Sequence, residues 1–171
     1  MQNYRISVLQ DDTLIKPFDC GDNDLNEFLF NDAKNYRNSL LAITYIMEND
    51  EDTIGYFTLL HDKIERTENS KWNKVNREIN NNKRRRTYPA IKIGRLAISK
   101  KYKGMRYGNL IIKSVIRNYL LEANPSAGCR FVTVDAYANA VEFYQKNGFH
   151  LLTDKDANEN TRTMFFDILT M

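Results

Sequence analysis

The chain of 171 residues (20.1 kDa) has the size of one compact domain and is long enough to bury a hydrophobic core. Hydrophobic residues make up 42% of it and charged residues 27%, an ordinary globular composition that excludes the collagen-like, low-complexity and disordered classes. No apolar run approaches the roughly 18 residues that a membrane span needs, and the polar N-terminus lacks the apolar core of a signal peptide.

Cysteine and histidine are too few and too scattered for a metal centre. The two cysteines, Cys20 and Cys129, cannot make a disulfide framework or a structural zinc site unaided. The two histidines, His61 and His150, have no ligand spacing. We therefore expect no metal ion, no membrane partner, and a reducing, cytoplasmic location.

Charge is distributed unevenly along the chain. The net charge of +3 combines a net charge of −8 over residues 1–62, +14 over residues 63–130 and −3 over residues 131–171. A central block this basic favours a partner that carries phosphates. A solvated basic face is the alternative, and charge alone does not decide between them.

The N-terminal quarter predicts a strand and then a helix. Residues 4–9 read as a short strand. Apolar residues recur every three or four positions over residues 25–36, which predicts an amphipathic helix. Asp22 or Asp24 is placed to cap it.

A β-hairpin and a polar segment between two strands are predicted next. Strands are predicted at residues 40–47 and 54–60, joined by the acidic residues 48–52, which we interpret as a solvated turn. Residues 67–86 are polar and hold six asparagines, so we interpret them as an excursion between strands with a short helix at 72–79.

Residues 88–121 predict a strand, a loop and a long helix. The strand over residues 88–98 contains Gly94, where glycine is typical of a bulge or a close backbone approach. The loop over residues 101–108 leads into a helix whose apolar residues run from Leu110 to Leu120.

The C-terminal part predicts a buried strand, a short helix and two closing strands. The strand covers residues 131–136, and Asn139 is placed to cap the helix that follows. Gly148 stands where a left-handed residue would end that helix. The closing strands are predicted at residues 149–152 and 163–169.

The loop from Lys103 to Gly108 has the composition of an anion site. Small residues let the main chain approach a ligand, and the first amides of a helix lack intrahelical partners, so their dipole favours a pyrophosphate. The spacing is neither that of a P-loop nor that of a dinucleotide-binding fingerprint. Alone, the loop is a weak signal.

A second unit, from Val134 to Phe149, makes the pattern specific. The two units together resemble the GNAT superfamily of acetyl-CoA-dependent N-acetyltransferases. The first resembles its signature Gln/Arg-x-x-Gly-x-Gly/Ala, with Lys103 in place of Gln/Arg and Arg106 in place of the first glycine. The second resembles its Asn-x-x-Ala/Val-x-x-Phe-Tyr-x-x-x-Gly-Phe pattern at Asn139, Phe143, Tyr144, Gly148 and Phe149.

A narrower resemblance is to the toxin-type GNAT branch. It is carried by Phe18-x-Cys20-Gly21-x-x-x-Leu25-x-x-Phe28-Leu29, and by Tyr88-Pro89-Ala90 leading to Gly94-Arg95-Leu96-Ala97-Ile98. Members of that branch acetylate the α-amine of aminoacyl-tRNA, block translation, and are neutralised by a small ribbon-helix-helix antitoxin. The N-terminal part of this pattern is shared with other GNAT proteins.

The resemblance implies an α/β (α+β) fold: a single domain over residues 1–171, with a central mixed, mostly antiparallel, twisted sheet of about six or seven strands flanked by about four helices. It also implies acetyl-CoA as cofactor. The cofactor-binding residues would be Leu96, Ala97, Ile98, Lys103, Gly104, Met105, Arg106, Tyr107, Gly108, Asn109, Asn139 and Phe143.

The catalytic residue that the resemblance implies is Tyr144, as the general acid that protonates the departing CoA thiolate. Backbone amides near Leu96 to Ile98 are the candidates for stabilising the thioester oxygen. No general base is evident, because Arg95 and Ser99 occupy the region where the family carries a glutamate. A water, or an acceptor amine that is already largely neutral, serves instead.

Three functions stay open at this point. In the first, a toxin acetylates aminoacyl-tRNA and binds it through Lys83, Arg84, Arg85, Arg86 and Arg95. In the second, an acetyltransferase acts on a small amine or a peptide or protein amine, for which an acidic pocket is expected. In the third, a non-catalytic RNA-binding domain shares the fold. A homodimer is retained as one oligomeric state.

Overall fold

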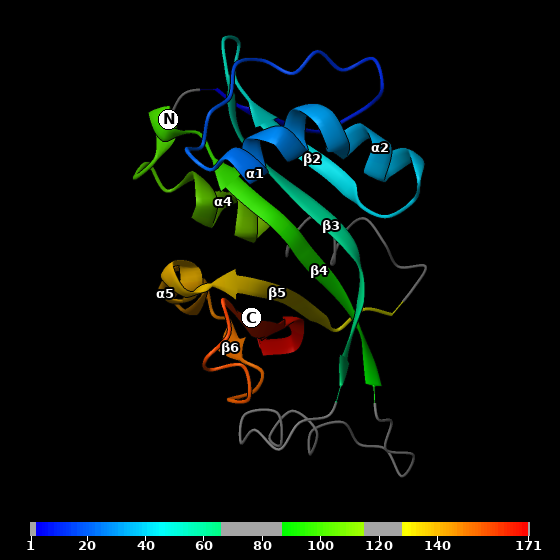
Figure 1. Ribbon diagram of the computed structural model, residues 1–171, viewed down its shortest axis with the longest axis vertical. Coiled ribbons are helices and arrows are strands. Elements are labelled where there is room, and N and C mark those ends of the chain that lie inside the picture. Colours follow the sequence, from blue (N-terminus) through cyan, green and yellow to red (C-terminus); the bar gives the residue numbers. More distant parts are fainter. Residues whose placement is uncertain (1–2, 66–86, 115–127, 171) are drawn as a thin grey trace. The chain divides into compact units, whose positions relative to one another are not determined.

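A computed structural model describes residues 3–65, 87–114 and 128–170 (Figure 1). The strands are β1 (Arg5–Val8), β2 (Ile43–Glu48), β3 (Thr53–Glu65), β4 (Thr87–Ile98), β5 (Phe131–Tyr137), β6 (His150–Leu151) and β7 (Thr161–Asp167). The helical segments are α1 (Asn23–Glu27), η1 (Phe28–Asp32), α2 (Ala33–Asn38), η2 (Lys100–Tyr102), α4 (Tyr107–Ser114), η4 (Ala138–Ala140), α5 (Val141–Lys146) and η5 (Ile168–Thr170).

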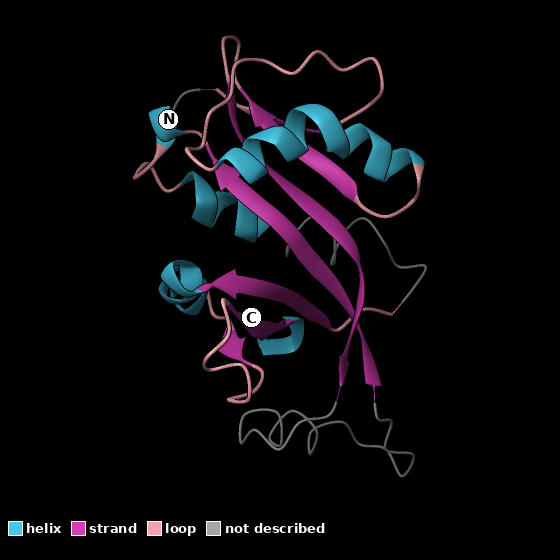
Figure 2. Cartoon of the chain, viewed as in Figure 1, coloured by secondary structure: helices cyan, strands magenta, loops and turns pink. Residues whose placement is uncertain are grey.

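The strands form one seven-stranded mixed sheet in the order β1-β2-β3-β4-β5-β7-β6 (Figure 2). The predicted α+β class and the strand number are therefore confirmed. The chain divides into two compact units, residues 1–60 with 93–117 and residues 61–92 with 118–171. Strands β3 and β4 run through both units, and each unit is described by itself below.

The first unit is built around a helical run that packs on the sheet. Asp22 caps α1, its side chain accepting a hydrogen bond from the Leu25 amide at 3.2 Å, as the sequence predicts. The run continues through η1, a π-helical turn, into α2, and α1 and α2 lie along one face of β2 and β3 (Figure 1). The buried cluster beneath it consists of Leu9, Phe18, Cys20, Phe28, Leu29, Ala33, Ile46, Tyr56 and Ala97.

Helix α4 belongs to the same unit and packs on β3 near its start. Beside it, Gly55 lets the end of β4 approach β3 closely. A Cβ at Gly55 would lie 2.7 Å from the Ala97 carbonyl oxygen and 3.5 Å from the Ile111 side chain of α4. Any larger residue at position 55 would therefore push β3 away from the end of β4.

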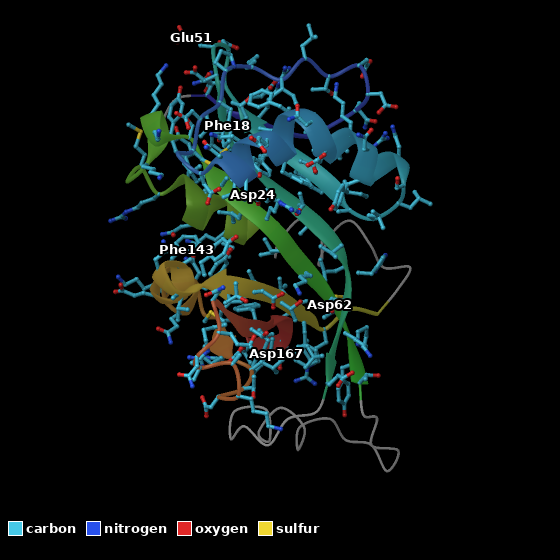
Figure 3. The ribbon with its side chains drawn as sticks, viewed as in Figure 1. Phe18, Asp24, Glu51, Asp62, Phe143 and Asp167 are labelled. Atoms are coloured by element: carbon cyan, nitrogen blue, oxygen red, sulfur yellow. The ribbon has the colours of Figure 1, made fainter. Side chains whose placement is uncertain are left out.

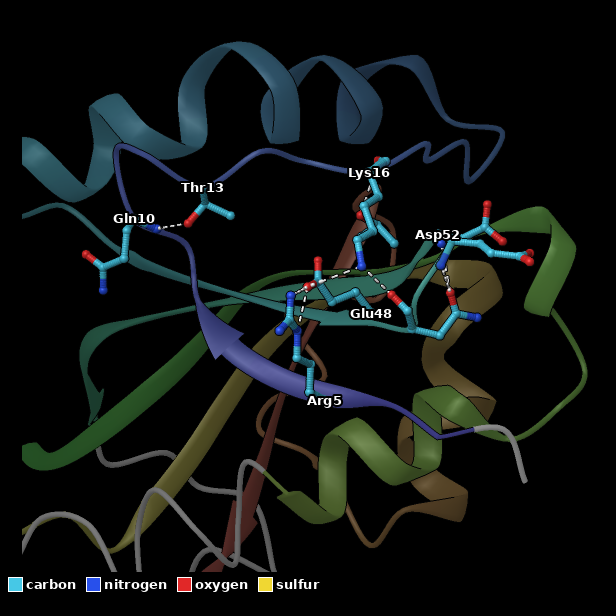
Figure 4. Close-up of polar contacts among 9 residues, drawn as sticks. Arg5, Gln10, Thr13, Lys16, Glu48 and Asp52 are labelled. Atoms are coloured by element: carbon cyan, nitrogen blue, oxygen red, sulfur yellow. Dashed lines mark hydrogen bonds and ion pairs between the residues drawn. The ribbon is translucent and has the colours of Figure 1, made fainter.

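The turn between β2 and β3 corrects one prediction. Residues 48–52 are not all solvated, because the Glu48 side chain is only 3% exposed. Its Oε1 accepts from Arg5, which β1 places directly opposite Glu48, and lies 3.7 Å from Lys16 Nζ. Figure 4 shows the two cations reaching the carboxylate from different sides. The local sequence could not reveal this pairing, since Arg5 lies 43 positions away.

The second unit is organised by a long antiparallel pairing of β5 with β7, which runs from Phe131↔Asp167 to Tyr137↔Thr161. Its core cluster is Ile64, Tyr88, Ala90, Phe131 and Phe165. Asp167, labelled in Figure 3, is buried and accepts two hydrogen bonds from the Arg130 guanidinium, at 3.0 and 2.6 Å. This two-point contact ties the end of β7 to the entry of β5.

The short helix α5 ends as predicted but does not begin as predicted. Gly148 has φ +87°, the left-handed conformation, and the Phe149 amide donates to the Tyr144 carbonyl at 3.0 Å. Asn139 does not cap the helix: it lies inside η4, and the N-cap is Ala140, which makes no side-chain cap bond. A 3₁₀ turn therefore replaces the predicted side-chain cap.

Three predicted features lie outside the described residues. They are the short helix at 72–79, the basic run from Lys83 to Arg86 and the later part of the helix that begins with α4. Among the described residues, no helix is long and apolar enough to cross a membrane.

Candidate active site

The predicted cofactor loop joins η2 to α4 with two residues in the left-handed conformation. Gly104 has φ +79° and Arg106 has φ +64°. The Leu110 amide donates to the Arg106 carbonyl at 3.1 Å, so the amides of Tyr107 and Gly108 stand at the N-terminus of the helix, where amides lack intrahelical acceptors. Arg106 thus takes the backbone conformation for which glycine is usually chosen, at the position where the signature has one.

The loop also presents positive charge to solvent. Lys103, Gly104, Met105 and Arg106 are all exposed. Within the part of the chain that the structure describes, neither Lys103 nor Arg106 forms an ion pair. Two uncompensated cations beside the first amides of a helix suit a doubly charged group such as a pyrophosphate. The residues present therefore fit the phosphates of CoA.

The turn η2, just before this loop, is anchored by acidic residues from two other segments. Lys100 Nζ lies 3.0 Å from Asp19 Oδ2, and the Lys100 amide donates to the Asp19 carbonyl at 2.8 Å. The Tyr102 hydroxyl donates to Asp52 Oδ2 at 2.6 Å, and Lys101 pairs with the same carboxylate. The sequence analysis missed Asp19 and Asp52, since no local pattern links them to the loop.

These contacts shift the pKa values of the groups involved. Hydrogen bonds from Asn26, Lys100 and the Gly21 amide lower the pKa of Asp19 to about 2. Hydrogen bonds from Lys101 and Tyr102 lower the pKa of Asp52, and the bond to Asp52 raises the pKa of Tyr102. Both carboxylates therefore stay ionised well below neutral pH.

The end of β4 lies directly before η2. Ala97 is buried in the core cluster of the first unit, whereas Leu96 and Ile98 are half-buried. The Ser99 amide donates to the Ile54 carbonyl at 2.9 Å, which holds the end of β4 against β3. Gly94 marks a close approach, because a Cβ there would lie 2.9 Å from Thr58 Oγ1.

Arg95 is held by aromatic rings rather than by a carboxylate. Its guanidinium carbon lies 3.8 Å from the centre of the Phe28 ring and 5.8 Å from that of Tyr36. Its amide donates to Thr58 Oγ1 at 2.8 Å. Among the described residues no acid pairs with the side chain, so a half-buried cation keeps hydrogen-bond donors for a ligand.

In the second unit, α5 carries the predicted catalytic residue. Tyr144 is 6% exposed and its ring makes edge contacts with Phe143 and Phe149, at centroid distances of 5.1 and 5.3 Å. Burial raises the pKa of Tyr144 above its ordinary value of 10. The phenol is therefore fully protonated at neutral pH, as a proton donor must be, although the higher pKa makes it a weaker acid.

The two other residues predicted in this region differ in exposure. Asn139 is exposed in η4, and Phe143, labelled in Figure 3, is half-buried on α5. The first unit thus brings together Arg95, the end of β4 and the loop from Lys103 to Asn109, while the second brings together Asn139, Phe143 and Tyr144.

Neither cysteine has the surroundings of a nucleophile. Cys20 is buried, with Sγ 3.1 Å from Asn26 Oδ1, and burial raises the pKa of Cys129. In residues 3–65, 87–114 and 128–170, no group of three or more His, Cys, Asp or Glu side chains is arranged to hold a metal ion.

Comparison with solved structures finds similar proteins over nearly the whole chain. A tyrosine-to-phenylalanine mutant of KacT is 26% identical, with a TM-score of 0.80 over 99% of this chain and 97% of that one. AtaT complexed with acetyl-methionyl-tRNAfMet is 25% identical, with a TM-score of 0.79 over 98% and 96%. AtaT with the corresponding kind of mutation, bound to the C-terminus of the antitoxin AtaR and acetyl-CoA, is 24% identical and shares the fold, with a TM-score of 0.77 over 99% and 96%.

Among proteins with curated descriptions, none matches the chain significantly. The model of a protein family described as "Acetyltransferase (GNAT) domain" matches residues 77–165, which is just over half of the chain. That range contains the end of β4, the loop with its two uncompensated cations, and α5 with Tyr144. The chain belongs to the GNAT family of acetyltransferases.

Proposed function

We propose that this acetyltransferase uses acetyl-CoA to acetylate the α-amine of aminoacyl-tRNA. Two observations support the choice of acceptor: the half-buried cation at Arg95, which no described acid compensates, and the net charge of +14 over residues 63–130. AtaT, 25% identical, has been solved with acetyl-methionyl-tRNAfMet. A polyanionic carrier of the amine suits such a surface, whereas a cationic small amine would be repelled by it.

The cofactor would be held by the loop from Lys103 to Asn109. Lys103 and Arg106 would meet the CoA phosphates, and the first amides of α4 would donate to them. Acetyl-CoA, when bound, supplies the acetyl group as a thioester. Asn139 and Phe143 are proposed as further cofactor contacts, together with the main chain of Leu96, Ala97 and Ile98.

Three features of the chain would serve the transfer itself. Amides at the end of β4 would stabilise negative charge on the thioester oxygen. Tyr144 would hold the proton that the departing thiolate takes up. The α-amine of an aminoacyl ester is less basic than that of a free amino acid and is largely neutral near pH 7, so no protein base is needed before it attacks. The proton that its nitrogen loses as the amide forms would pass to a water molecule, and the tyrosine would be reprotonated from solvent.

The proposal extends to a toxin–antitoxin pair in the cytoplasm, where charged tRNA is made and used. A mutant of AtaT has been solved with the C-terminus of its antitoxin AtaR, and this chain shares that fold. The neighbouring gene is a direct check, since a small ribbon-helix-helix protein encoded upstream favours the pair. A homodimer is compatible with this proposal.

The test of the acceptor is acetyl transfer to three substrates: charged tRNA, uncharged tRNA and spermidine. Transfer to charged tRNA alone is expected. Replacing Arg84, Arg85 and Arg86 with Ala should weaken tRNA binding and flatten its salt dependence, because fewer counterions are released. Acetyl-CoA affinity should hardly change.

Gly108→Glu is the control variant that should lose acetyl-CoA binding, in contrast to the triple arginine variant, which should lose tRNA binding. Its carboxylate at the first turn of α4 would repel the pyrophosphate, so it should abolish acetyl-CoA binding more than it affects folding. Acetylation of spermidine in preference to charged tRNA would favour the small-amine alternative. Tight tRNA binding without any transfer would favour the non-catalytic RNA-binding alternative.

A further inference from the structure

We propose that Asp52 and Asp19 position the cofactor loop, so that Lys100 and Lys101 are structural cations and only Lys103 and Arg106 carry charge to the CoA phosphates. This inference rests on the proposed acetyl-CoA site. It concerns four basic residues within seven positions, Lys100, Lys101, Lys103 and Arg106, whose different roles cannot be told from their charge alone.

Both acids reach η2 from segments far away in the chain. Asp19 lies in the loop before α1 and holds Lys100 through its main-chain carbonyl as well as its side chain. Asp52 lies in the turn between β2 and β3 and accepts from Lys101 and Tyr102. Asp19 therefore holds the first residue of the turn, and Asp52 holds the other two.

The Tyr102 hydroxyl is the central contact. The Tyr102 ring is 4% exposed, and its hydroxyl both donates to Asp52 at 2.6 Å and accepts from Asn49 Nδ2 at 2.9 Å. The ring also meets Tyr107 edge-on at a centroid distance of 5.8 Å. Tyr102 directly precedes the loop and Tyr107 is the first residue of α4, so the residue that Asp52 holds also packs against the start of that helix.

The turn that carries Asp52 is itself anchored. Glu48 pairs with Arg5, and Lys16, which lies near Glu48, donates to the Asn49 carbonyl (Figure 4). Asn49 Oδ1 in turn accepts from the Asp52 amide at 2.8 Å. The acid that holds the loop therefore sits on a rigid base, and a preorganised loop loses less conformational entropy when it binds a ligand.

The charge assignment follows from the same contacts. Lys100 pairs with Asp19 and Lys101 pairs with Asp52 within the same unit, so each of these two charges has a partner there. Lys103 and Arg106 face none among the described residues. A phosphate at the loop would meet the second pair, and the first pair would act only through the shape of the loop.

The experiment measures the dissociation constant of CoA by calorimetry for Asp52→Asn, Tyr102→Phe and the double variant. Each single change should weaken binding roughly 3- to 10-fold, the range for one lost hydrogen bond. Tyr102→Phe removes the donor of the Tyr102–Asp52 hydrogen bond and Asp52→Asn removes its charged acceptor, so the double variant should lose less than the sum of the two single losses. Asp50→Asn is the matched control, since Asp50 is exposed in the same turn.

A second arm compares two lysines across a salt series. Lys103→Met should flatten the salt dependence of CoA binding, whereas Lys101→Met should weaken binding and leave the salt dependence unchanged. In turnover assays, Asp52→Asn should raise KM for acetyl-CoA and leave kcat and the KM of the acceptor as they are.

Wild-type affinity in both Asp52→Asn and Tyr102→Phe would overturn this inference alone, as would equal losses in Asp50→Asn. Failure of the wild-type protein to bind CoA at all would instead overturn the proposed cofactor site, and this inference with it.

Discussion

The guanidinium of Arg95 stacks on the ring of Phe28, 3.8 Å from its centre. Phe28 opens the π-helical turn η1, a distortion that often marks functional positions in helices. The stack holds a cation at the end of β4 without a carboxylate, two residues before Ala97. An arginine held in this way is preorganised for an anionic ligand.

Replacing Arg95 with Gln removes both its stacking and its charge, and two measurements distinguish the effect on stability from the effect on the acceptor. Arg95→Gln should lower the free energy of unfolding by about 1 kcal/mol, the usual value of a cation–π contact. It should also reduce acetylation of charged tRNA while acetyl-CoA affinity stays unchanged. Denaturant titration and a turnover assay measure the two effects. Undiminished acetylation in Arg95→Gln would show that the cation serves stability alone.

Tyr144→Phe should keep acetyl-CoA binding and lower turnover by roughly 10²- to 10⁴-fold, the usual scale for a lost general acid. The ring packs against Phe143 and Phe149, and the variant preserves those contacts while it removes the hydroxyl. Calorimetry with single-turnover kinetics makes the comparison. A variant as active as the wild type would mean that Tyr144 is a packing residue.

Arg106 offers a test of backbone strain. Its φ of +64° costs an L-residue about 1–2 kcal/mol, which glycine avoids at a smaller entropic cost. The free energy of unfolding should therefore be about 1 kcal/mol larger for Arg106→Gly than for Arg106→Ala. Both variants should lose the same CoA affinity, because both lose the charge. If the two variants were equally stable, the left-handed conformation would carry no strain.

Asp19 gives a pH dependence with a defined sign. Its pKa falls from the ordinary 3.8 to about 2 in the folded protein, so its ionised form stabilises the fold. That contribution is complete above about pH 5 and is lost as the pH falls through 3.8 towards 2. Thermal midpoints of wild type and Asp19→Asn should differ at pH 7 and approach each other only as the pH falls below about 2. A constant difference over this range would contradict the assignment.

Local sequence signals predicted the fold well where a single residue determines local structure. The Asp22 cap and the left-handed Gly148 each depend on the chemistry of one residue and its immediate neighbours. The wrong predictions concern other cases. Glu48 is buried because Arg5 lies opposite it in the sheet, and Asn139 does not cap α5 because a 3₁₀ turn precedes the helix.

The same distinction between local and long-range determinants applies to the residues of the candidate site. Lys103 to Gly108 and Tyr144 were found because each lies in a short motif that matches a family pattern. Asp19, Asp52 and Tyr102 were not found, because their contacts join segments that lie 50 to 81 positions apart. The stack of Arg95 on Phe28 likewise depends on the tertiary packing of the helical run on the sheet.

One measurement tests the central claim most directly. A pool of charged tRNA is incubated with the protein and acetyl-CoA and is then digested with a nuclease. The masses of the released aminoacyl-adenosines are measured by mass spectrometry. We expect one or more of them to gain the mass of one acetyl group on the α-amine, and none to do so with Tyr144→Phe at the same short reaction time. Unmodified aminoacyl-adenosines after complete incubation with wild-type protein that binds acetyl-CoA would contradict the account.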